Sequence, residues 1–207
     1  MFSQKQKQAK LFQTLANERQ MTSLMEKEVV AGIGDFVYDR ANWVSLYYDT
    51  GRRAHSDDGT QVAYRAITTD GQLLWYVKTD GKAHMYHSLA TCPFEAFEEA
   101  NAAIAKRRSV KSGWADVQAH AWRLATFRER HDVLIKDAYA SPLCPLGIQS
   151  FLRSLGIGKA KRIPGFLAGW LMLIDPQLGF VIHEARLRHG IAAPLWTSID
   201  ASLTPTG

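Results

Sequence analysis

The stretch DGTQVAYRAITTDGQLLWYVKTDG, residues 58–81, decides the fold class. Its three Asp-Gly pairs, which end at Gly59, Gly71 and Gly81, offer the positive backbone angles that tight β-hairpins require. Apolar and β-branched residues alternate in the runs between these pairs, Gln61–Thr68 and Gln72–Lys78. This pattern is typical of an antiparallel sheet with one buried face. We therefore predict consecutive strands joined by hairpin turns.

The predicted sheet extends in both directions along the chain. Similar runs precede it at 36–38 and 42–48, and one follows at 82–88. Together these runs predict an antiparallel meander of four to five strands. The sheet needs a cover, and Pro93 begins a helical pattern that has acidic residues early and basic residues late, as helix ends prefer.

The remaining chain is predicted to be mainly helical. A long helical pattern runs from Trp114 to Tyr139, and a short helix is expected at 146–155. Asp175-Pro176 lies between two apolar runs and is interpreted as a hairpin turn between strands 170–174 and 180–183. The fold class is therefore α+β, a meander covered by helices, with a C-terminal helical and β-hairpin portion.

Composition favours one domain with short appendages. The 207 residues can bury a core without disulfides. We expect an N-terminal helix at 1–30, a single α+β domain at 31–193 and a loose tail at 194–207. Within the domain, 31–90 is the β-rich half and 91–193 the mainly helical half.

Compartment and membrane association are also predicted from the sequence. The two cysteines, Cys92 and Cys144, have neither a disulfide nor a zinc pattern, and the first ten residues lack the apolar run of a secretory signal. A cytoplasmic location is therefore expected. The apolar stretch 163–182 approaches the length of a membrane span, but prolines, glycines and Asp175 interrupt it, so we expect no membrane insertion.

The net charge of +5 favours acidic partners, and two basic clusters are candidate contacts for a nucleic-acid backbone. The segment 155–163 resembles the Gly-Ile-Gly turn of a helix-hairpin-helix DNA-binding element, in which backbone amides and lysines meet a phosphate. A glycine-rich helix cap with a solvated basic loop is the structural alternative. The candidates from both clusters are Lys106, Arg107, Arg108, Lys111, Gly156, Gly158, Lys159, Lys161 and Arg162.

A second candidate surface combines aromatic rings with arginines. Adjacent aromatic residues on a strand point to opposite faces, so one ring of each pair tends toward solvent. Aromatic residues beside arginines are typical of protein-interface hot spots. The predicted partner-binding residues are Arg52, Arg53, Arg65, Trp75 and Tyr76.

Histidines and acids suggest chemistry without completing any catalytic signature. His120 and His131 lie on the long predicted helix, and His131-Asp132 resembles the doublet of HD-type phosphohydrolases. A core histidine is the structural alternative for His131. No nucleophile elbow, Walker loop or dinucleotide fingerprint is present. We therefore predict no catalytic residues, no metal and no cofactor, while leaving an enzyme open.

The sequence supports three functional hypotheses. The first is a non-catalytic cytoplasmic protein that modulates or inhibits a protein partner, for example a plasmid or phage accessory factor that inhibits conjugative transfer or host defence. The second is binding to the backbone of DNA or RNA through the Gly-Ile-Gly loop. The third is a metal-dependent phosphoesterase or nuclease. A homodimer formed through the N-terminal helix is a further possibility.

Overall fold

A computed structural model describes residues 20–82 and 85–190 of the chain. The chain forms two compact units, and each takes in two separate stretches of sequence. Of the described residues, unit 1 contains 20–82, 85–104 and 144–158, and unit 2 contains 105–143 and 159–190. The predicted tail at 194–207 and the first part of the predicted N-terminal helix lie outside the described residues.

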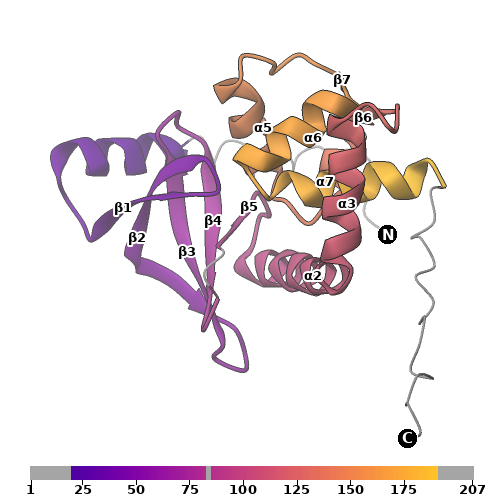
Figure 1. Cartoon of the computed structure of the whole chain (residues 1–207). Coiled ribbons are helices and arrows are strands. Elements are labelled where there is room, and N and C mark those ends of the chain that lie inside the picture. Colours follow the sequence, from indigo (N-terminus) through magenta and orange to yellow (C-terminus); the bar gives the residue numbers. More distant parts are fainter. Residues whose placement is uncertain (1–19, 83–84, 191–207) are drawn as a thin grey trace, which may run out of the picture. The chain divides into compact units, whose positions relative to one another are not determined.

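The predicted α+β fold is confirmed, and unit 1 contains the antiparallel meander (Figure 1). Each strand pairs with its neighbours in the chain. Gly59, Gly71 and Gly81 all have positive φ, between 66° and 84°, as the Asp-Gly pairs predicted. The strands are β1 (Phe36–Ala41), β2 (Val44–His55), β3 (Gln61–Thr68), β4 (Leu73–Thr79) and β5 (Tyr86–Ser88).

The sheet of unit 1 is covered on both faces rather than on the single face that we predicted. One face packs its Val44, Tyr48 and Tyr76 with Leu146 of helix α5 (Pro145–Ser154). The other packs its buried residues with the first part of helix α2 (Pro93–Ser112). The reason lies in the uninterrupted apolar run of β4, because such a run supplies side chains to both faces of a sheet. Residues 20–31 form one further helix.

Unit 2 is helical and contains a small two-stranded sheet. Short strands β6 (Asp132–Leu134) and β7 (Arg162–Pro164) pair antiparallel although about 30 residues separate them. The helices that lie wholly within unit 2 are α3 (Trp114–Ala125), α4 (Ile135–Ala140), α6 (Gly165–Ile174) and α7 (Leu178–Arg188).

Two sequence predictions for unit 2 are wrong. The expected hairpin strands at 170–174 and 180–183 are instead parts of α6 and α7. Asp175 accepts a hydrogen bond from the backbone N–H of Gln177 at 2.9 Å, so Asp175-Pro176 leads into a helix rather than turning a hairpin.

The predicted long helix 114–139 is also wrong, because α3 ends at Ala125. Thr126 donates its hydroxyl to the carbonyl of Trp122, and Phe127 adopts a left-handed φ of 59°. A left-handed residue cannot continue a right-handed helix. The chain then reverses direction and continues into β6 and α4. No glycine or proline marks this end of the helix in the sequence.

Glycine spacing explains how α6 packs in unit 2. Gly165 and Gly169 are four residues apart and therefore lie on one face of α6. A Cβ on Gly169 would lie 2.5 Å from the carbonyl oxygen of Ala121 and 2.8 Å from the amide nitrogen of Ala125. The backbones of α3 and α6 thus touch directly. Among the described helices none is long and apolar enough to cross a bilayer.

Candidate functional site

The predicted partner-binding residues have different environments in unit 1. Arg52 is held by ion pairs to Glu28 at 2.9 Å and to Asp49 at 3.3 Å. Arg65 lies over the ring of Trp75, 5.1 Å from its centroid. Tyr76 is completely buried, so this residue belongs to the core and not to the surface that we predicted for it. Arg53 is exposed at the edge of the bulge in β2.

The basic residues at the end of α2 make contacts within unit 2. Lys106 forms an ion pair with Glu184 at 3.0 Å and donates to the carbonyl of Ala140. Arg107 donates to a backbone carbonyl and packs over an aromatic ring, and Lys111 lies 5.6 Å from the ring centroid of Trp114. Arg108 is exposed. These contacts provide a structural role for most of this cluster.

The Gly-Ile-Gly segment caps α5. Gly156 follows the end of the helix with φ of 70°, which is the usual left-handed glycine of a helix C-terminus. Gly158 belongs to unit 1, and Lys159, Lys161 and Arg162 to unit 2. A strand, β7, then precedes the next helix, whereas a helix-hairpin-helix element would continue directly into its second helix.

The structure brings together three residues that the sequence did not connect. His120 lies in the last half of α3, and Glu129 and His131 follow the left-handed turn at Phe127. Their ligand atoms, two imidazole nitrogens and a carboxylate oxygen, all lie within 4.8 Å of one another. We call these three residues the HEH cluster. It is the one group of this kind among the residues described.

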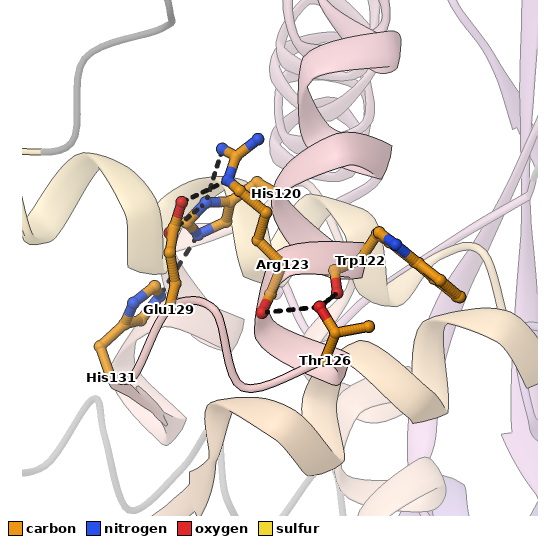
Figure 2. A network of polar contacts seen from close by, with 6 residues as sticks. All are labelled: His120, Trp122, Arg123, Thr126, Glu129 and His131. Carbon is orange, nitrogen blue, oxygen red and sulfur yellow. Dashed lines mark hydrogen bonds and ion pairs between the residues drawn. The ribbon is translucent and has the colours of Figure 1, made fainter.

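Close contacts fix the geometry of the HEH cluster (Figure 2). Nε2 of His120 lies 3.4 Å from Nε2 of His131, and the two ring centroids are 5.1 Å apart. Nδ1 of His120 lies 2.8 Å from Oε2 of Glu129. This oxygen is buried and accepts no aligned hydrogen bond, although the nitrogen is close. Arg123 forms an ion pair with the other oxygen of Glu129.

Burial governs the charge of both histidines. His120 is completely buried, and this desolvation lowers its pKa to about 4 despite the opposing effect of Glu129. Burial, together with the neighbouring His189, also lowers the pKa of His131. Since both rings are neutral at pH 7, each has one nitrogen lone pair available to a ligand or a proton.

One side of the HEH cluster opens into a pocket of about 630 Å³ in unit 2. Glu129 and His131 lie in its wall, as does Arg130, which forms no ion pair with any described residue. Two exposed aromatic rings, those of Phe127 and Phe166, stack at 5.0 Å on its rim. Asp132 also borders the pocket, but its carboxylate pairs with Arg162 at 3.0 Å. The carboxylate beside the histidines is thus that of Glu129, whereas an HD-type site would use Asp132.

His120 and His131 were expected on one long helix, and Glu129 was not among the candidate residues. Their convergence depends on the left-handed turn at Phe127, for which the sequence gives no signal. Comparison with protein-family models, with curated proteins and with solved structures finds no match for this chain.

Proposed function

We propose that the HEH cluster binds a divalent metal ion and that unit 2 is a metal-dependent phosphoesterase. The observation that carries this proposal is the convergence of His120, Glu129 and His131 within 4.8 Å at the wall of an open pocket. Two histidines and one carboxylate that leave a coordination position open are one of the ligand sets of catalytic zinc sites.

The spacing of the two imidazoles fits one shared ion. Two nitrogens bound to a tetrahedral zinc ion at about 2.0–2.1 Å would lie about 3.3 Å apart, with their ring centres about 5 Å apart. The corresponding distances between His120 and His131 are 3.4 Å and 5.1 Å. A carboxylate oxygen of Glu129 lies within 4.8 Å of a nitrogen of each imidazole and would be the third ligand, once it leaves its contact with Nδ1 of His120.

The surrounding residues favour an anionic substrate. Arg130 borders the pocket and can bind a phosphate oxygen. Arg123 forms an ion pair with Glu129 and so holds this carboxylate in place, which is the role expected of a positioning residue. The metal, when bound, would supply Lewis acidity toward a phosphoryl oxygen.

Metal binding is tested first, by titration calorimetry with Co²⁺ and by the absorption spectrum of the Co²⁺ form. We expect intense tetrahedral bands for the wild type and at least a tenfold loss of affinity for His131→Gln. His55→Gln, the same change at an exposed position in unit 1, is the control and should bind as the wild type does. Equal affinities for wild type and His131→Gln would refute the metal site.

Phosphoesterase activity is tested with bis(p-nitrophenyl) phosphate and the Co²⁺ or Zn²⁺ form. Arg130→Ala should raise KM, because it removes the cation that borders the pocket. Arg128→Ala makes the same change two residues away and should leave KM unaltered. If the protein binds metal but hydrolyses no phosphoester, the proposed metal site stands and the proposed phosphoesterase activity is wrong.

A second candidate function, modulation of a protein partner, is favoured by the surface of α6. Trp170, Leu173 and Ile174 are each more than half exposed, and Trp122 of α3 is also exposed. Exposed apolar groups of this size are typical of interaction sites. A purified partner should bind the wild type at least tenfold more tightly than Ile174→Asp and equally well after nuclease treatment. Loss of binding with nuclease would favour the nucleic-acid hypothesis instead.

A further inference from the structure

The sulfur of Cys144 in unit 1 occupies the N-terminal cap of a helix. It precedes α5, a helix of ten residues, and accepts a hydrogen bond from the backbone N–H of Gly147 at 3.3 Å. The residue is only 3% exposed. Amide groups at a helix N-terminus stabilise negative charge that develops on an atom placed there.

His87 on β5 points one ring nitrogen at this sulfur. Its Nδ1 lies 3.2 Å from Sγ of Cys144, and its ring stacks on Tyr76 with an interplanar angle of 17°. The ring is completely buried, and its other nitrogen, Nε2, has no hydrogen-bond partner. A buried nitrogen without a partner destabilises the fold, and a functional role is one of the few explanations for retaining such a group.

The pair is therefore a thiol and a base in contact. Burial lowers the pKa of His87 to about 4, so the ring is neutral at pH 7. With its hydrogen assigned to Nε2, Nδ1 has a lone pair directed at the thiol. Because a ring with so low a pKa does not hold the thiol proton in the resting protein, the proton passes to Nδ1 only as the sulfur attacks, while the Gly147 amide stabilises the charge on sulfur.

We propose that Cys144 is a peroxide-sensitive thiol for which His87 acts as the base. Cys144 is only 3% exposed, and this burial restricts the reagent to a small one, such as hydrogen peroxide. The proton of the thiol passes to Nδ1, sulfur attacks one peroxide oxygen, and the O–O bond breaks. The departing hydroxide takes the proton from His87 to form water. Sulfur is oxidised by two electrons to a sulfenic acid, and peroxide is reduced.

Cys92 provides an internal control within unit 1. It is more exposed than Cys144, and the described structure shows no imidazole in contact with it. Accessibility alone predicts that Cys92 reacts faster, whereas a base in contact predicts the reverse order. A comparison of the two cysteines in one molecule therefore distinguishes the effect of a neighbouring base from the effect of solvent exposure.

The test exposes the full-length protein to hydrogen peroxide at pH 7 with a dimedone probe, and peptide mass spectrometry follows each cysteine. In the folded protein we expect Cys144 to be labelled about tenfold faster than Cys92, because only Cys144 has a base in contact that can take its proton during attack. In urea the two rates should become equal. The urea comparison needs no variant and is unaffected if a substitution at His87 impairs folding.

Two variants complete the test. His87→Gln should slow labelling of Cys144 at least tenfold in the folded protein and leave it unchanged in urea. Cys92→Ser should not alter the rate at Cys144. The proposal is overturned if native Cys144 reacts no faster than Cys92, or if its rate is independent of peroxide concentration and so reports only opening of the fold.

Discussion

The two units of this protein are stabilised by different kinds of contact. In unit 1 the strands follow one another along the chain, and each turn supplies its own hydrogen bonds. The turn at Asp58-Gly59 is an example, since Asp58 accepts hydrogen bonds from the Ser56 hydroxyl at 2.7 Å and from the Thr60 amide at 3.0 Å. In unit 2 the decisive contacts join segments that are far apart in sequence.

A buried ion pair and a direct contact between two helix backbones are examples of such long-range contacts in unit 2. Arg188 of α7 donates two hydrogen bonds of 2.8 Å to the buried carboxylate of Asp137, which lies about 50 residues earlier in the chain. Gly169 lets α6 touch the backbone of α3, and Gly165 lets it touch the backbone carbonyl of His131. The fold of unit 1 therefore depends on many local interactions that each contribute a modest free energy. The fold of unit 2 depends on a few contacts between distant segments, and no neighbouring residue can replace them.

The largest effect is expected from breaking the Asp137–Arg188 pair. Asp137→Ala leaves the guanidinium without its carboxylate and also removes the acceptor of the Leu134 amide, 2.8 Å away. We expect a loss of about 3–5 kcal/mol in the free energy of unfolding, measured by urea titration. Asp132→Ala is the control, because its pair with Arg162 is exposed and should contribute about 1 kcal/mol or less. Similar losses for both variants would contradict this view of unit 2.

A smaller effect is expected from adding one methyl group between α3 and α6. Gly169→Ala places a Cβ within 2.8 Å of two backbone atoms of α3, which cannot move as a side chain could. Overpacking of this kind costs about 1–3 kcal/mol and outweighs the helical preference of alanine. Gly158→Ala makes the same change where the nearest atom is 3.7 Å away, and we expect it to be nearly neutral. Hydrogen exchange should localise the loss from Gly169→Ala to α3 and α6.

The same difference explains which parts of the molecule were predictable from sequence. Strand β3 was predicted at 61–68 because its flanking Asp-Gly pairs specify the turns locally. The helices at 165–174 and 178–188 were missed, since their apolar runs fit strands as well and Asp175-Pro176 suits either a hairpin or a helix start. The Gly165 and Gly169 spacing was the available signal for a helix.

The HEH cluster was predictable only in its parts. His120 and His131 are visible as histidines, but eleven positions separate them and a continuous helix would have placed them about three turns apart. The turn at Phe127 brings them together, and tertiary packing imposes that turn on a residue that rarely adopts a left-handed φ. Glu129 stands between two arginines, where a carboxylate usually indicates a solvated surface.

The smallest effect tests the local character of unit 1. Gly59 has a φ of 70°, and a Cβ there would meet no atom within 4 Å, so a substitution changes only the backbone preference. We expect Gly59→Ala to cost about 1 kcal/mol, because alanine disfavours the left-handed region. Gly59→Asn should recover much of that loss, since asparagine tolerates this conformation. Hydrogen exchange should confine the change to the ends of β2 and β3. If the loss instead spread through the sheet as far as β5, the turns of unit 1 would be coupled, and the contrast with unit 2 would not hold.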